Sequence, residues 1–152
     1  MRTKEDTHWH GHIRVTATFA DGTQQVDEFD NLITAAGLNL LRDSLRGQGV
    51  QEITYVALGA DNTAPAAGDV TLGDERERFP VTSQTAGGTG VLTTMAFVQA
   101  YEATTFTTEE IGWFAGAATE VLDSGTLVAR VLYPRAKTGL ESLQIERTDT
   151  IS

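Results

Sequence analysis

The sequence predicts a mainly-β fold: a single β-sandwich or barrel-like domain of about eight strands with one α-helix. Three features predict this class: short runs of alternating apolar and polar residues, turn residues between those runs, and one stretch with helical periodicity. A chain of 152 residues is expected to form one domain that buries roughly 70% of the surface exposed by its unfolded chain. No internal repeat or domain boundary interrupts residues 12–152.

The first elements are an extended arm and a β-hairpin. Residues 1–11 lack periodicity and predict the arm. From residue 12 to residue 19 apolar and polar residues alternate, which is typical of a half-buried strand. Asp21-Gly22 then predicts a tight turn into a second antiparallel strand.

A single helix is predicted near residues 34–46. Thr34 can cap its N-terminus, and three leucines at helical spacing lie on one face, namely Leu38, Leu41 and Leu45. Gly37 in the first turns costs about 1 kcal/mol relative to alanine, which indicates close packing against the sheet.

The rest of the chain predicts further strands and one long loop. Residues 51–58 are apolar on both faces, so we expect a central strand. The loop covers residues 60–73, and loops of this length are usually functional or contact partners. Pro80 favours an edge position or a bulge. The predicted strands cover residues 12–19, 23–29, 51–58, 76–85, 91–101, 104–114, 127–133 and 140–151.

Residues 109–114 join two acids, a glycine and three large apolar side chains. Because a buried unpaired charge is costly, we expect Glu110 at the edge of the core or paired with Arg78 or Arg130. Gly112 predicts a bulge or the close approach of another group. Adjacent residues on a strand point to opposite faces, so Glu109 and Glu110 are not expected to form a catalytic pair.

Composition restricts the classes of function. The chain has 11 Lys and Arg against 21 Asp and Glu, a formal net charge of −10, which disfavours general binding to nucleic acid or anionic membranes. The absence of cysteine excludes disulfides, thiolate zinc sites and a cysteine nucleophile. No apolar run approaches the roughly 20 residues needed to span a bilayer, and no signal peptide is recognisable, so we expect a soluble protein made in the cytoplasm.

All three histidines lie in or next to the predicted arm, at His8, His10 and His12. Alternate residues of an extended segment face the same way, so these imidazoles could face one metal ion. No acid or cysteine stands at ligand spacing, and we expect no metal; Trp9 is expected to anchor the arm in a pocket instead. The sequence has neither a Gly-x-Ser-x-Gly elbow nor a phosphate-binding loop, so no catalytic residue and no cofactor is expected.

Several short motifs follow one another in a defined order from residue 31 onward. The motifs are Asn31-Leu32-Ile33, Gly37, Tyr55-Val56-Ala57-Leu58-Gly59, a loop with Pro65, Asp69 and Leu72, then Glu75, Arg78, Glu110-Ile111-Gly112-Trp113-Phe114, Gly125-Thr126-Leu127-Val128-Ala129-Arg130 and Lys137. With this order of motifs the chain resembles a group of virion proteins of tailed bacteriophages. The group comprises capsid decoration (cement) proteins built on a β-tulip-like domain, and related tail collar or fibre-type proteins.

The resemblance implies a non-enzymatic structural protein, a homotrimer that binds the major capsid protein on the exterior of the assembled capsid. A tail collar, fibre or tail-tip protein is the alternative, although a tail-fibre member would be expected to continue into a shaft. A surface-glycan depolymerase that uses paired acids is an alternative of another class. The expected partner contacts are Trp9, His10, Asp61, Asn62 and Pro65.

Overall fold

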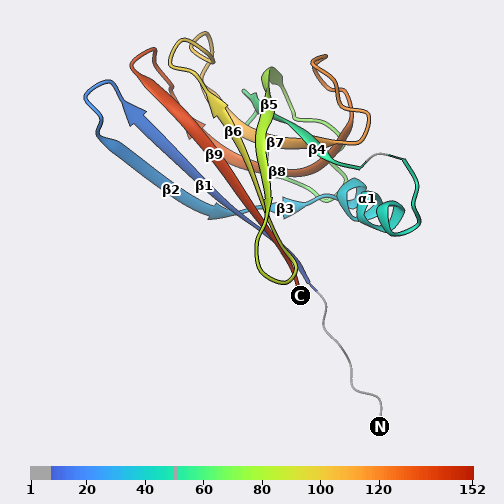
Figure 1. Cartoon of the computed structure of the whole chain (residues 1–152). Helices are drawn as coiled ribbons and strands as arrows, with labels where there is room; N and C mark the ends of the chain where they lie inside the picture. The colour runs from blue at the N-terminus through green and yellow to red at the C-terminus, as the bar shows by residue number, and fades with distance from the viewer. Residues whose placement is uncertain (1–7, 50) are drawn as a thin grey trace.

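The computed structural model describes residues 8–49 and 51–152. In this part of the chain nine strands form one nearly closed, barrel-like sheet with a single helix beside it, which confirms the predicted mainly-β class (Figure 1). The elements are β1 (Trp9–Phe19), β2 (Gln24–Asp30), β3 (Leu32–Ile33), α1 (Ala35–Leu45), β4 (Ile53–Gly59), β5 (Glu75–Ala86), β6 (Val91–Val98), β7 (Thr108–Ala115), β8 (Thr126–Arg135) and β9 (Glu141–Ile151).

The strands follow the order β2-β1-β9-β6-β5-β4-β7-β8-β3, and all neighbours are antiparallel. The strand at one edge, β2, leads through Asn31 into the strand at the other edge, β3, so the chain itself brings the two edges of the sheet together. Strand β4 lies between β5 and β7, the interior place expected for a strand that is apolar on both faces. The two-residue strand β3 is too short to have produced an alternating pattern.

Strand β5 passes from one half of the barrel to the other. Residues 75–80 pair with β4, whereas residues 81–86 pair with β6. Pro80 is the last residue of the first part, and the register with β6 shifts just after it, between Val81 and Ser83. Proline lacks a backbone donor, and it stands at the changeover, where β5 has a partner on one side only.

Strand β1 begins at Trp9, so residues 9–11 belong to the sheet and not to an arm. Trp9 and Gly11 face Ile151 and Asp149 of β9 in register, and the backbone of His8 exchanges hydrogen bonds with Ser152 (2.7 and 3.0 Å). Residues 9, 11 and 13 are more buried than residues 10, 12 and 14, respectively, as expected for a strand. The sequence does not show this alternation clearly, because Gly11 has no side chain. The remainder of the predicted arm, residues 1–7, lies outside the described residues.

Helix α1 begins after Thr34, whose hydroxyl accepts a hydrogen bond from the Gly37 N–H (2.9 Å), as predicted for the cap. Gly37 is buried against β8, and a Cβ at this position would lie 3.1 Å from Val128 Cα. The leucine face is only partly covered: Leu41 is half-buried, whereas Leu38 is 54% and Leu45 is 85% exposed. The helix therefore contacts the barrel through Gly37 and Leu40 and presents Leu38 and Leu45 to solvent.

The core has two parts on opposite sides of β7. Ile111 and Trp113 point into the barrel and belong to the main cluster. On the outer side, Phe114 packs with Leu72 and two further residues, Ala57 and Leu127, beneath the loop of residues 60–74. Gly112 leaves room for this loop, because a Cβ there would lie 2.6 Å from Leu72 Cδ2. The close approach expected at Gly112 is thus a leucine from the long loop.

Candidate functional site

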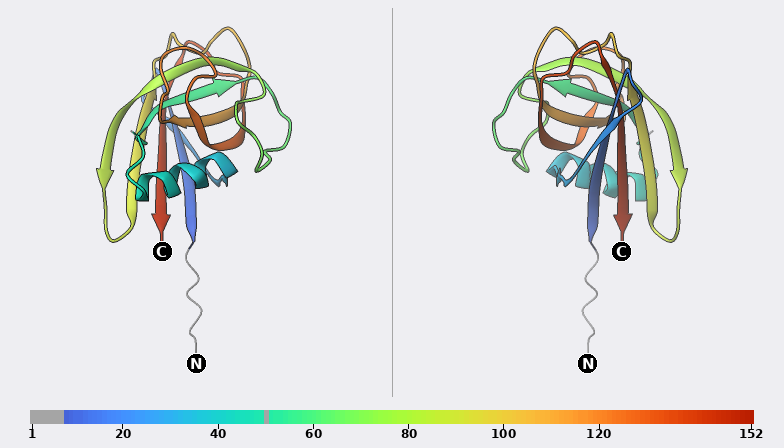
Figure 2. Two further views of the ribbon diagram at one scale, coloured as in Figure 1. Left: turned by 90° about the vertical axis from the view of Figure 1, so that its right-hand side faces the viewer. Right: turned by 90° about the vertical axis from the view of Figure 1, so that its left-hand side faces the viewer.

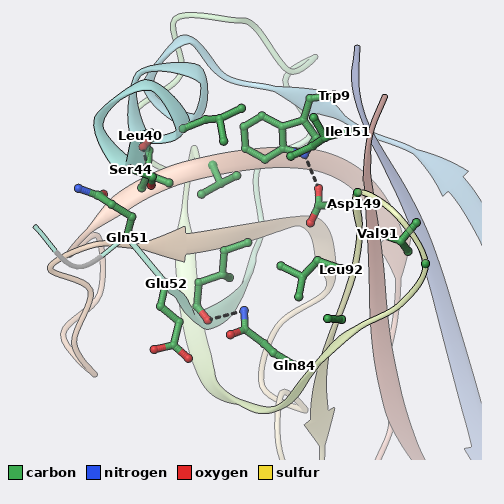
Figure 3. A pocket seen from close by; sticks show the side chains of 16 residues that line it. Trp9, Leu40, Ser44, Gln51, Glu52, Gln84, Val91, Leu92, Asp149 and Ile151 are labelled. Carbon is green, nitrogen blue, oxygen red and sulfur yellow. Dashed lines mark hydrogen bonds between the residues drawn. The ribbon is translucent and has the colours of Figure 1, made fainter. Parts of the chain in front are cut away.

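A cavity of about 440 Å³ opens at the end of the barrel, between α1 and the β5–β6 hairpin (Figure 3). Its wall is mainly apolar and includes Trp9, Leu40, Leu41, Ile53, Leu92 and Ile151. These side chains come from β1, α1, β4, β6 and β9, so only the folded sheet creates the cavity. An apolar hollow with a few polar groups at its margin is the usual form of a binding site.

Two carboxylates line this cavity, those of Glu52 and Asp149, and the carboxylate of Asp149 is hydrogen-bonded on both sides. Asp149 accepts a hydrogen bond from the Trp9 indole N–H (2.8 Å). The buried guanidinium of Arg147 donates to the same carboxylate through Nε (2.8 Å) and Nη2 (2.6 Å). Arg147 also lies over the Trp113 ring, 5.1 Å from its centroid. Because the charge of Asp149 is balanced by Arg147 and its oxygens accept hydrogen bonds, this carboxylate holds the cavity wall in place.

Trp9 therefore forms part of the wall of a cavity in its own chain, and its expected contact with a partner stays a prediction. Asp149 and Arg147, on which its orientation depends, were not predicted as site residues. They lie 140 and 138 positions further along the sequence, and no local signal connects them to Trp9. Only the pairing of β1 with β9 brings them together.

A second group of charged side chains is centred on Glu110. Its carboxylate is completely buried and accepts a hydrogen bond from Arg130 Nε at 2.6 Å. It also accepts hydrogen bonds from three backbone N–H groups of the long loop, those of Gly73 (3.0 Å), Asp74 (2.8 Å) and Asp61 (3.3 Å). Glu110 thus attaches the loop of residues 60–74 to the outside of the sheet.

Of the two arginines predicted as partners of Glu110, Arg130 is the one that pairs with it. Strand β8, which carries Arg130, is the direct neighbour of β7, whereas β4 separates β7 from the strand of Arg78. Arg78 pairs instead with Glu75 through Nε (2.7 Å) and Nη2 (2.8 Å), and lies over the Phe114 ring at 4.5 Å. Glu109 is half-buried, lies at the register shift between Thr108 and Glu110, and forms no ion pair or side-chain hydrogen bond among the described residues.

The loop residues expected to contact a partner are held on the sheet surface with different exposure. Asn62 is exposed, while Asp61 and Pro65 are half-buried. A hydrogen bond from the Thr63 hydroxyl, and then one from the Thr63 N–H (2.6 Å), lower the pKa of the Asp61 carboxyl. The backbone carbonyl of Asp61 accepts a bond from Arg130 (3.4 Å). Their contact with a partner stays a prediction.

His10 and His12 contact acidic side chains that were not predicted to lie near them. His12 Nδ1 lies 3.1 Å from Asp30 Oδ1, and its Nε2 lies 3.3 Å from Glu28 Oε1. His10 Nε2 approaches Asp30 Oδ1 at 3.1 Å. Hydrogen bonds to Asp30 and then to Glu28 raise the pKa of His12, and the bond to His12 lowers the pKa of Asp30.

These contacts are a pairing of imidazoles with carboxylates across β1 and β2. Within residues 8–49 and 51–152 no group of three or more His, Asp or Glu side chains is arranged to hold a metal ion. The side chain of His8 makes no contact that would join it to His10 and His12 in one site among these residues. The Asp21-Gly22 turn was the available signal, because the register of its hairpin places Asp30 opposite His12.

Comparison with known proteins identifies no relative: no family model matches the chain, and neither the curated proteins nor the solved structures contain a match. The one helix of the described residues is too short to cross a lipid bilayer.

Proposed function

We propose that this chain is a non-enzymatic structural protein of a tailed-phage virion, and specifically a capsid decoration protein. In this role it binds the major capsid protein on the outside of the assembled capsid as a homotrimer. The order of motifs from about residue 31 onward, with its resemblance to decoration and tail proteins, supports the virion assignment. The net charge of −10 suits a position outside the shell, away from packaged DNA.

The observation that carries a binding role is the uncovered apolar surface at one end of the barrel. Leu38 and Leu45 of α1 are exposed, and the 440 Å³ cavity opens beside the same helix. Exposed apolar surface that adjoins a hollow is typical of a protein contact. A partner that covers this end would complete the burial that α1 leaves unfinished.

The buried charged side chains hold parts of the fold in place. Glu110 and Arg130 fix the long loop, and Arg147 and Asp149 fix Trp9. Such a frame presents its loops and helix in fixed positions for a partner. Binding that favours the assembled lattice would stabilise the shell by mass action, and many copies would add avidity.

Copy number in purified virions tests the assignment. We expect quantitative mass spectrometry to find this chain in hundreds of copies per particle, in a fixed ratio to the major capsid protein. A handful of copies would move the protein to the tail, the alternative that the same motif resemblance supports. Absence from virions of the phage that encodes it would refute both.

A further inference from the structure

We propose that strand β5 has an open edge that accepts an extended segment of the partner protein as an added β-strand. A large apolar side chain of that segment enters the cavity beside α1, and a neighbouring lysine or arginine meets Glu52. The inference rests on the proposed function in one respect, that the chain has a protein partner.

The first reason is that β5 changes neighbours. Residues 81–86 pair with β6 on one side, and among the strands of the described residues none pairs with their other side. Figure 2 shows the β5–β6 hairpin extending to the same end of the molecule as the C-terminus, beside α1. Unpaired backbone groups along such an edge can form a ladder with another chain.

The second reason is the chemistry of the edge. The outer strand β2 carries three acids, Asp27, Glu28 and Asp30, and charge of this kind discourages the addition of a strand. Residues 81–86 of β5 read Val-Thr-Ser-Gln-Thr-Ala and contain no charge and no proline. The fold therefore protects one edge against pairing and leaves the other competent for it.

The third reason is that two hollows follow this edge. The cavity of about 440 Å³ reaches Gln84, Ala86 and Gly88. A second hollow of about 710 Å³ lies along residues 80–84 and shares Glu52, Ile53 and Gln84 with the first. In the wall of the second hollow the Thr54 hydroxyl oxygen is buried and has no hydrogen-bond partner among the described residues. A strand laid along β5 could place side chains in these hollows.

The fourth reason is charge. No lysine, arginine or histidine lines either hollow, and the carboxylates are those of Asp149 and Glu52. Asp149 is neutralised by Arg147, whereas Glu52 is exposed and forms no ion pair within the described residues. With a chain net charge of −10, the complementary segment carries a basic residue beside its apolar anchor.

A peptide of defined sequence tests the edge directly. The probe is the acetylated and amidated heptapeptide Thr-Thr-Lys-Leu-Lys-Thr-Thr, titrated into the full-length isotope-labelled protein and followed by NMR. We expect saturable shifts at the amides of residues 81–88 and at the Trp9 indole N–H. The same peptide with N-methyl groups on alternate amides cannot form the ladder and should bind at least about tenfold more weakly. Absence of saturable shifts, or shifts confined to another surface, would overturn the proposal.

Two matched pairs of variants locate the contact. A Cβ at Gly88 or at Gly68 meets no atom within 4 Å, so Gly88→Phe and Gly68→Phe are both expected to fold. Gly88→Phe places a ring at the cavity and should weaken peptide binding about tenfold, while Gly68→Phe in the long loop should not. Glu52→Gln should weaken binding by a few fold and reduce its salt dependence, whereas the exposed Glu120→Gln should leave both unchanged. Equal effects within either pair would count against the groove.

Binding of the same variants to virions depleted of this chain separates the inference from the proposed function. Reduced occupancy by Gly88→Phe, with normal occupancy by Gly68→Phe, is the expected result. If Gly88→Phe decorates virions as the wild type does, the groove is not the partner site, although the virion role stands. If wild-type protein fails to bind, the virion role falls, and the peptide titration alone decides the edge. Self-association that Gly88→Phe abolishes would show a second copy as the occupant and overturn the assignment to a partner protein.

Discussion

At the scale of the residue, Glu110 links parts of the chain that are far apart in the sequence. It is completely buried and joins three parts of the molecule: β7, Arg130 on β8 and the backbone of the long loop. Removing one member of a buried pair leaves the other charge without compensation, which is the costly way to break such an interaction.

We therefore expect Glu110→Ala to lower the free energy of unfolding by about 3–5 kcal/mol. Urea denaturation measures the change, and Glu109→Ala on the same strand is the matched control. The control should cost much less, because Glu109 is only half-buried and has no ion pair among the described residues. Equal stability of the two variants would show that the pair with Arg130 is not a structural anchor.

At the scale of the element, the β1–β2 hairpin has an edge whose charge balance depends on pH. Asp30 and Glu28 of β2 face His12 of β1, and Arg14 lies next along β1. On the other side of β1, strand β9 places Thr148 and Thr150 opposite His12 and His10, and Glu146 opposite Arg14. The neighbouring groups are mostly acidic or neutral, which favours the protonated imidazole.

The pKa of His12 is raised in the folded chain, so its pairing contributes stability that is fully present below about pH 6.5, its unfolded value. This contribution disappears as pH rises through the folded value. We expect hydrogen-exchange protection factors of β2 amides to be higher at pH 5.5 than at pH 8, beyond the change seen elsewhere in the sheet. His12→Gln should remove this difference, whereas His8→Gln should retain it. A pH dependence that survives His12→Gln would assign it to another group.

Helix α1 is the second element of interest, because leucine side chains on one of its faces are exposed to solvent. Its leucine face has the spacing of a buried stripe, yet Leu45 is 85% exposed. Leu45→Ser should change the free energy of unfolding by no more than roughly 0.5 kcal/mol, because little apolar surface is lost from the core.

The same variant should bind depleted virions less tightly than the wild type. Val121→Ser, in the loop between β7 and β8 and 64% exposed, provides a control of similar exposure that should bind normally. Quantification of bound protein by mass spectrometry gives the comparison. Normal occupancy by Leu45→Ser would exclude the leucine face from the contact.

At the scale of the whole molecule, the nearly closed sheet separates a fixed frame from its exposed ends. Buried ion pairs lie on both sides of that frame, Arg147 with Asp149 within the barrel and Glu110 with Arg130 beneath the loop. The uncovered features are the open part of β5, the leucine face of α1 and the cavity between them. Binding is therefore proposed at the end of the barrel, where the arrangement of strands leaves backbone and apolar surface unpaired.

The sequence by itself determined the fold class, eight of the strands, the helix with its Thr34 cap, and the need of Glu110 for a partner. These follow from alternation, turn residues and the cost of a buried charge, all of which act over a few neighbouring residues. Only the tertiary structure decided that Arg130 is that partner, that Trp9 meets Asp149, and that β5 divides its pairing between β4 and β6. Such contacts depend on the order of strands in the sheet, and no local pattern specifies which distant strands become neighbours.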